Sequence, residues 1–291
     1  MSKLKGYALG VTSSATFGLI PLFSLPLLQA GMNTPSILMF RFGIAAIVVA
    51  AIILGKHLSA KVTWRQVSIL ALMGVLNFFS ALLLFTGYSY MSSGVTTVTH
   101  FVYPIFVSLI MFLFFGQKMP WSNALAIVLA IMGVALLAGV LEGDNRVSLL
   151  GLFIVVLSGL AYALYIVVVN KSGISSVHYL TITFYVMLFD CLLFGLFAAT
   201  SPGITPPLAW NHWGLLLLLA LLPSVVSNIT LVLAIDLLGS TPTAILGAME
   251  PVTAVGVGAL VFGEQITLWQ GIGIFAILLA VFVIVRSNRR P

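Results

Sequence analysis

The chain has 291 residues, of which 61% are hydrophobic and only 6% are charged, and its mean hydropathy is +1.22. Soluble globular domains carry roughly a quarter of charged residues, so this composition excludes that class. The apolar residues form continuous runs of about 20, the length of a membrane-spanning helix, and do not alternate with polar residues as in a membrane β-barrel. The sequence therefore predicts an all-α integral membrane protein whose surroundings are the lipid bilayer.

Ten apolar runs follow one another along the chain, separated by short polar or Gly/Pro-rich connections that leave no room for a soluble domain. The predicted transmembrane helices cover residues 6–28, 35–55, 66–87, 94–115, 121–141, 149–169, 176–200, 212–234, 241–262 and 267–285.

The basic residues lie mainly at the ends of these runs, so the formal net charge of +6 reflects membrane topology and not a nucleic-acid partner. If the N terminus is cytoplasmic, only Arg146 falls in an outer loop, and Arg41 lies inside a run. The inner set then holds ten of the twelve Lys and Arg residues: Lys3, Lys5, Lys56, Lys61, Arg65, Lys118, Lys171, Arg286, Arg289 and Arg290. We therefore expect both termini on the cytoplasmic side of a bacterial inner membrane.

Polar side chains interrupt several runs of the first half. Arg41 is the only cation within a run, and Asp190 of the seventh run lies at a comparable depth. The two form a structural or gating ion pair, or Arg41 binds a substrate carboxylate. In the fourth run, Thr96, His100 and Tyr103 are spaced so that they share one helix face.

The second half contains a similar set of polar positions. Glu250 lies near the centre of the ninth run beside Pro251, on one face with Thr243 and Gly247. Other candidate lining residues are Asn77 of the third run, Tyr162 of the sixth, and Ser227 and Asn228 of the eighth. Hydroxyl and amide groups of this kind either line a cavity or hold neighbouring helices together by hydrogen bonds.

The two halves are related by an offset of 147 residues, which aligns Asn77 with Ser224, Pro104 with Pro251 and Gly116 with Gly263. The same offset places Tyr103 opposite Glu250. Each half has five runs, an odd number, so the second copy enters the membrane from the opposite side. The sequence therefore predicts two inverted five-helix repeats, residues 1–145 and 146–291, around a central cavity, an arrangement typical of secondary transporters.

A carboxylic acid in the middle of a membrane helix is costly and indicates function by default. Burial disfavours its charged form, so Glu250 is a candidate carrier of a proton or a partner for a substrate amine. The alternative is a permanently protonated side chain bonded to a backbone carbonyl that Pro251 leaves free. His100 is either a second proton carrier or a neutral hydrogen-bonding group, and Tyr103 is a lining residue.

Two segments carry a resemblance to a known family. They are YSYMSSGVTTVTHFVYPIFVSLIMFLFFGQKMPWSNALAIVLAIMGVALL and AIDLLGSTPTAILGAMEPVTAVGVGALVFGEQITLWQGIGIFAILLAVFVIV. Each has a small-residue start, a mid-helix proline, a Phe-Gly turn and a glycine-containing helix after it. The chain resembles EamA-type members of the drug/metabolite transporter superfamily. Gln117 stands where the family usually has an acid, and Phe17 where a Trp is common. The resemblance implies ten helices, a central cavity and the movement of small metabolites.

The sequence has no P-loop, no Cys or His pairs at metal-ligand spacing and no nucleophile elbow, so we expect no cofactor, no metal and no enzymatic activity. The function predicted is export of small amphipathic metabolites, such as amino acids, nucleobases or drugs, by alternating access, with or without proton coupling. A monomer would complete its own site. The alternatives are an uncoupled metabolite facilitator and an intramembrane enzyme that uses Glu250 with His100.

Overall fold

The structure is a computed structural model that describes residues 3–90, 93–118, 120–137, 148–200, 203–207, 209–261 and 267–287. Its helices are α1 (Lys3–Phe17), α2 (Ile20–Gln29), α3 (Thr34–Gly55), α4 (Trp64–Gly87), α5 (Ser93–His100), α6 (Tyr103–Phe115), α7 (Trp121–Leu137), α8 (Leu149–Lys171), η1 (Ile174–Ser176), α9 (Tyr179–Thr200), α10 (Trp210–Ala220), η2 (Leu221–Val226), α11 (Ser227–Leu238), α12 (Ser240–Leu246), α13 (Met249–Val261) and α14 (Leu268–Ser287). The predicted repeat boundary at residues 145 and 146, the second Phe-Gly turn (262–263) and the outer-loop Arg146 lie outside the described residues.

Several helices begin and end at residues whose chemistry favours a boundary. The side chain of Asn33 accepts the Ser36 N–H at 2.9 Å before α3. Thr63 and Gln66 form a reciprocal capping box at the start of α4. Such caps satisfy backbone N–H groups that have no partner within the helix. Gly116 ends α6 in the left-handed conformation, with φ of 61°.

Three of the predicted spans are broken near their middle. The breaks lie at Gly18–Leu19 between α1 and α2, at 101–102 between α5 and α6, and at 247–248 between α12 and α13. A proline follows each break within the first turn of the next helix: Pro21, Pro104 and Pro251. Proline is tolerated there because its missing N–H would have no helical partner at a helix start. The mid-helix prolines therefore mark where each second half-helix begins.

Six helical segments are long and apolar enough to cross a membrane by length and composition among the described residues. They are Lys3–Gln29, Thr34–Gly55, Trp64–Gly87, Leu149–Lys171, Tyr179–Thr200 and Trp210–Leu238. The other four predicted spans are also helical, but α5 with α6 and α12 with α13 are pairs of short half-helices, and the apolar parts of α7 and α14 are shorter. Local hydropathy does not distinguish a continuous span from a broken one, because the residues at a break stay apolar.

Tryptophans mark the ends of several spans. Trp64, Trp121 and Trp210 are the first residues of α4, α7 and α10, and they are 84%, 90% and 91% exposed. Trp and Tyr are enriched where a membrane meets water, because their rings are apolar and carry one polar group. Large apolar side chains such as Leu113 and Phe114 are exposed along the helix sides. This surface is that of a multi-pass membrane protein.

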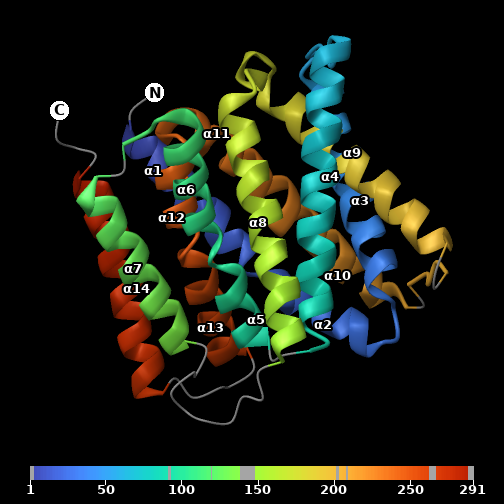
Figure 1. Cartoon of the computed structure of the whole chain (residues 1–291). Coiled ribbons are helices and arrows are strands. Elements are labelled where there is room, and N and C mark those ends of the chain that lie inside the picture. Colours follow the sequence, from blue (N-terminus) through green and yellow to red (C-terminus); the bar gives the residue numbers. More distant parts are fainter. Residues whose placement is uncertain are drawn as a thin grey trace.

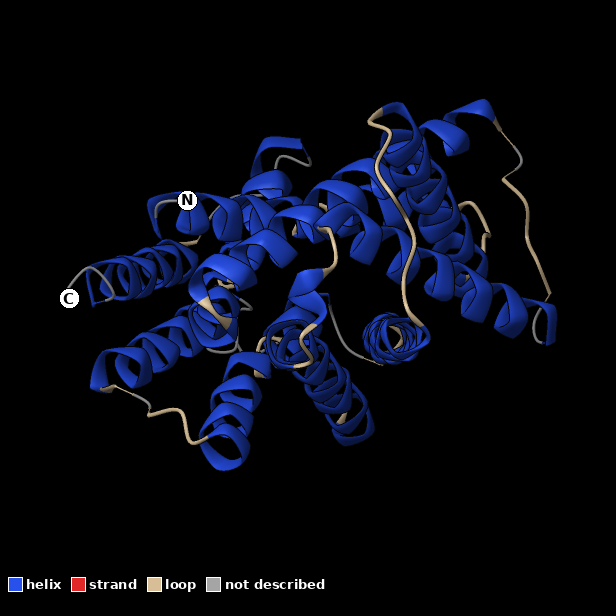
Figure 2. Cartoon of the chain, turned by 90° about the horizontal axis from the view of Figure 1, so that it is seen from above, coloured by secondary structure: helices blue, strands red, loops and turns tan. Residues whose placement is uncertain are grey.

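The helices pack side by side with no sheet in the described part of the chain (Figures 1 and 2). α3 packs on α9, α4 on α8, α1 on α11, and α7 pairs with α14 at one flank (Figure 1). The first turn of α1 and the last turn of α14 lie at the same end of the bundle (Figure 1). The breaks in α1–α2, α5–α6 and α12–α13 come together in its interior.

Candidate functional site

Glycines allow the three helix breaks to approach one another closely. A Cβ added at Gly18 would collide with the backbone carbonyl of Glu250, so the α1–α2 break lies against the start of α13. A Cβ at Gly247 would collide with the hydroxyl of Tyr103, so the start of α6 lies against the α12–α13 break. At Gly159 of α8, a Cβ would lie 3.0 Å from the carbonyl oxygen of His100. The half-helix ends therefore meet at the centre of the molecule.

A small cavity lies beside this meeting point. Its volume is about 20 Å³, room for roughly one water molecule. It is lined by Phe17, Ile20, Arg41, Phe42, Asn77, Ser80, Ala81, Leu84, Phe85, His100, Tyr162 and Asn228. The structure thus brings together five of the predicted site residues, Arg41, Asn77, His100, Tyr162 and Asn228, from five different helices. In this conformation the cavity is too small for a metabolite.

Arg41 is only 2% exposed and is held by the eighth span. Its Nε donates to Ser224 Oγ at 2.7 Å, and Nη2 donates to the Pro223 carbonyl oxygen at 3.3 Å. Its guanidinium also lies 4.9 Å from the centre of the Phe42 ring. Both hydrogen-bond partners belong to η2, a single π-helical turn between α10 and α11. Such turns occur frequently at functional sites.

The predicted ion pair between Arg41 and Asp190 is not formed in this structure. Asp190 Oδ2 instead accepts a hydrogen bond from Asn77 Nδ2 at 2.6 Å. The other carboxylate oxygen, Oδ1, is buried without a hydrogen-bond partner among the described residues. Each side chain instead has a polar partner on another helix, Arg41 on η2 and Asp190 on α4, which sequence spacing could not assign. A gating role for the two residues stays a prediction.

His100 is buried at the end of α5, where the chain leaves the helix. Its Nδ1 is 3.1 Å from Ser158 Oγ, and Ser158 donates in turn to the Ser80 carbonyl oxygen at 2.7 Å. Its Nε2 is buried without a hydrogen-bond partner among the described residues. The ring therefore keeps one polar atom free beside the small cavity, which it helps to line. A buried polar atom of this kind is costly unless something binds it.

Aromatic rings surround the cavity on the side of α8. The Tyr162 ring stacks on Phe17 at 6.1 Å between ring centres and meets Tyr103 edge-on at 4.9 Å. Tyr165, one turn further along α8, donates from its hydroxyl to Asn228 Oδ1 at 3.1 Å. Phe17 of α1 and Tyr162 of α8 thus bring one aromatic ring from each half of the chain to the cavity. Phe42, which carries no distinguishing signal in the sequence, adds a further ring.

Glu250 lies at the start of α13 and is partly buried. It is not among the side chains that line the small cavity, although its backbone carbonyl lies against Gly18 at the α1–α2 break. The carbonyl of Gly247, four residues before Pro251, accepts the Glu250 backbone N–H at 2.9 Å. No hydrogen bond joins the Glu250 carboxyl group to another described residue, so the bond to a freed carbonyl that we considered is not seen.

Two of the predicted lining residues lie elsewhere. Ser227 Oγ donates to the Ser13 carbonyl oxygen at 3.0 Å, and Ser13 Oγ donates back to the Ser227 carbonyl oxygen at 2.9 Å. This reciprocal pair joins α1 to α11, as expected of polar groups that hold helices together. Thr96 is fully buried in α5, and its methyl group would lie 3.0 Å from a Cβ added at Gly87. Neither residue lines the small cavity.

The polar and charged groups at the centre of the molecule come from several helices. Within the described residues, no three His, Cys, Asp or Glu side chains lie close enough to hold a metal ion. The charged groups, Arg41, Asp190 and Glu250, come from three different helices and are accompanied by amides, hydroxyls and aromatic rings. Of these three, only Arg41 lines the small cavity. A few polar groups among apolar and aromatic side chains are typical of small-molecule binding sites.

Comparisons with known proteins agree with this arrangement. The sequence pattern of the EamA-like transporter family matches residues 4–139 and again residues 149–286. An uncharacterized transporter from Synechocystis sp. is 29% identical over 218 residues, which make up 74% of this chain and 64% of that protein. This chain therefore aligns with less than two thirds of the relative's length.

A second relative and a solved structure are similar over more of their length. An uncharacterized transporter from Archaeoglobus fulgidus is 24% identical over 252 residues, or 85% of this chain and 87% of that protein. A solved crystal structure superimposes with a TM-score of 0.83 at 15% identity, covering 99% of both chains. That likeness concerns the fold. Because the family pattern covers nearly the whole of this multi-pass membrane protein, the chain belongs to the EamA-like transporter family.

Proposed function

We propose that the protein is a secondary transporter that exports small amphipathic metabolites, such as amino acids, nucleobases or drugs, by alternating access. The observation that carries the proposal is the closed polar cavity where three broken helices meet. Binding sites of secondary transporters are typically formed by discontinuous helices near the middle of the membrane. A cavity of about 20 Å³ must widen before it admits cargo, which is what a carrier does during its cycle.

The positions of the breaks support an inverted-repeat organisation. α5 ends at His100 and α12 at Leu246, 146 residues later. α6 begins at Tyr103 and α13 at Met249, again 146 residues later. We propose ten spans in two inverted five-helix repeats, residues 1–145 and 146–291, in a bacterial cytoplasmic membrane with both termini inside. Each half contributes one helix of this matched pair, α5–α6 or α12–α13, so a monomer completes the site.

Glu250 and His100 are the proposed proton- or substrate-binding groups, with Tyr103, Tyr162, Asn77 and Asn228 around the cargo. Arg41 and Asp190 set the charge balance of the cavity. A phosphate-bearing cargo needs more than one buried cation, and Arg41 is the only one inside a predicted span. The cargo is therefore neutral or zwitterionic.

An uncoupled facilitator is the second candidate, favoured by the position of Glu250 outside the small cavity. An intramembrane enzyme would need Glu250 and His100 to act on one bound substrate.

The test uses purified protein in liposomes. A panel of radiolabelled metabolites in counterflow identifies the cargo, and an imposed pH gradient then measures coupling. Glu250→Gln keeps the size of the side chain but cannot release a proton, so we expect it to abolish pH-driven accumulation while counterflow of the same cargo persists. Gln66→Glu, at the exposed start of α4, is the control for a change of charge elsewhere. Unchanged pH-driven accumulation by the Gln variant would show that Glu250 is not the proton carrier, whereas a wild-type protein without pH-driven accumulation would be a facilitator.

A further inference from the structure

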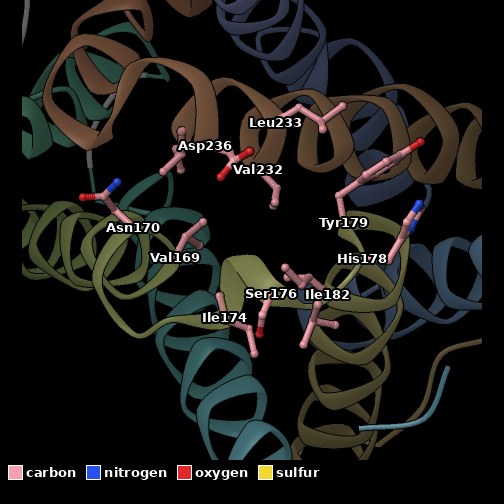
Figure 3. Close-up of a pocket in the computed structure, with 12 residues that line it drawn as sticks. Val169, Asn170, Ile174, Ser176, His178, Tyr179, Ile182, Val232, Leu233 and Asp236 are labelled. Atoms are coloured by element: carbon pink, nitrogen blue, oxygen red, sulfur yellow. The ribbon is translucent and has the colours of Figure 1, made fainter. Parts of the chain in front are cut away.

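A second and much larger pocket lies away from the central cavity, at the end of the molecule where α8 connects to α9 (Figure 3). Its volume is about 350 Å³, within the range of small-molecule binding sites. It shares no lining residue with the central cavity. Figure 3 shows Asp236 and Val232 on one side of the opening and Ile174, Ser176 and Ile182 on the opposite side. By the orientation proposed above, this end faces the cytoplasm.

The charge of the pocket comes from Asp236. It is the only Asp, Glu, Lys or Arg among the lining residues, and it is exposed near the C-terminal end of α11. The carbonyl groups at the end of a helix carry partial negative charge, so they add to the potential of the carboxylate. No described residue forms a salt bridge or hydrogen bond with this carboxylate. Lys171, the nearest basic residue along α8, lies outside the lining, with its Nζ 5.3 Å from the centre of the Phe115 ring.

The N-terminus of α9 also borders the pocket, and a free helix N-terminus would favour an anion. Here its N–H groups already have partners. His178 Nδ1 accepts the Leu180 N–H at 3.3 Å, and the His178 carbonyl oxygen accepts the N–H groups of Thr181 and Ile182 at 2.8 and 3.1 Å. The helix start is therefore capped by its own chain. The negative charge of Asp236 therefore decides which ligand charge the pocket favours, and it favours a cation.

The rest of the wall is suited to an apolar body with one polar group. Ile174, Ile182 and Val232 provide aliphatic contact, and the rings of His178 and Tyr179 stack at 4.3 Å between centres along one edge. Asn170 and Ser176 add hydrogen-bonding groups. The first repeat has no copy of the acid, because the offset of 147 residues pairs Asp236 with Ser89. The acid of this pocket therefore has no counterpart at the aligned position of the first half.

We propose that this pocket binds small organic amines in their cationic form, with Asp236 as the counter-charge. The site would capture cargo bearing an ammonium group before the central cavity opens. That role as a loading site rests on the transport function proposed above, whereas binding itself does not.

The experiment measures equilibrium binding to the full-length protein in phosphatidylcholine nanodiscs, with three ligands of matched shape. These are 2-phenylethylamine, which is a cation at neutral pH, neutral 2-phenylethanol and anionic 3-phenylpropionate. We expect the amine to bind best. Asp236→Asn should weaken amine binding by roughly tenfold to a hundredfold, the effect of losing a hydrogen bond to a charged group, and should remove the preference over the alcohol. Asp236 is exposed, so this isosteric change is expected to leave the thermal stability unaltered.

Three further variants distinguish binding in this pocket from binding elsewhere on the protein. Val232→Phe should fill the pocket and weaken the amine and the alcohol alike. Lys171→Gln changes the charge near the same end without touching the lining, so amine affinity should not fall. Glu250→Gln should leave the Asp236-dependent binding intact. The proposal is overturned if Asp236→Asn binds the amine as well as the wild type does, or if 3-phenylpropionate binds equally well. Counterflow activity that persists in that case would leave the transport function standing.

Discussion

At the scale of single residues, the helices at the centre of the molecule can approach closely because some positions have no side chain. Gly247 has no side chain, and the hydroxyl of Tyr103 occupies the space where a Cβ would be. At the aligned position of the first half, His100 fills the corresponding place with a ring. The offset of 147 residues therefore pairs a large residue with a small one, and Tyr103 contacts the glycine across the two halves.

This contact makes a prediction for Gly247→Ala. The added methyl group would overlap the Tyr103 hydroxyl, and overpacking of this kind costs about 1–3 kcal/mol. We expect a lower apparent melting temperature in detergent, measured by size-exclusion chromatography after heating. Tyr103→Phe removes the hydroxyl oxygen, so the double variant should recover part of the loss. Equal losses with and without the hydroxyl would mean that Tyr103 and Gly247 do not touch as described.

At the scale of elements, the breaks in α5–α6 and α12–α13 are the features that position the site. Each break leaves a half-helix that begins beside the cavity and contains a proline in its first turn, Pro104 or Pro251. Proline cannot donate the backbone hydrogen bond that would join the two half-helices. The η2 turn performs a related function in the eighth span, where Arg41 binds the backbone and hydroxyl groups that the π-helical turn presents.

Replacing the prolines tests whether the breaks serve transport. Pro104→Ala and Pro251→Ala restore a backbone donor and favour a continuous helix, so we expect folding to be retained or improved. Counterflow should slow by roughly tenfold, the effect of about 1.4 kcal/mol on the barrier for opening. Pro35→Ala, in the first turn of the unbroken α3, is the matched control and should leave the rate unchanged. Full activity in both break variants would show that the breaks are only structural.

At the scale of the whole molecule, the orientation that we propose in the membrane rests on the distribution of charge. The loop around Lys61 is one of the predicted inner loops, which are rich in basic residues. The connection before α10 contains no basic residue. The start of α1 and the end of α14 lie at the same end of the molecule (Figure 1), in agreement with the even number of crossings that we propose. The amine pocket at Asp236 is on the side assigned to the cytoplasm, so the orientation decides whether it can load cargo for export.

Cysteine labelling checks this orientation. The single native cysteine, Cys191, is first replaced by Ala. Lys61→Cys, between α3 and α4, and Asn211→Cys, in the first turn of α10, then place one exposed thiol on each predicted side of the membrane. In intact cells, a membrane-impermeant maleimide should label the thiol at position 211 and leave that at position 61 unlabelled until the cells are opened. The reverse pattern would invert the topology and put the Asp236 pocket outside.

Part of the candidate site could be predicted from the sequence because polar residues in apolar runs are conspicuous. Arg41, Asn77, His100, Tyr162 and Asn228 were identified in this way, and the structure places all of them on one cavity. Phe42 carried no such signal, since it is one of many aromatic residues in apolar surroundings. The Asp236 pocket was also missed, because an acid at the end of a span is indistinguishable in sequence from an ordinary wetted turn residue.

The sequence by itself determined what depends on neighbours along the chain: the all-helical class, the apolar runs, the caps, and the prolines at which half-helices begin. Only the tertiary structure decided which polar groups meet. Asn77 binds Asp190 across 113 residues, and Arg41 binds Ser224 across 183. The spacing of residues along a helix predicts which of them share a face. Which neighbouring helix that face contacts depends on how whole helices pack. That packing is set by many small contacts, such as those at Gly18, Gly159 and Gly247, which no local pattern reveals.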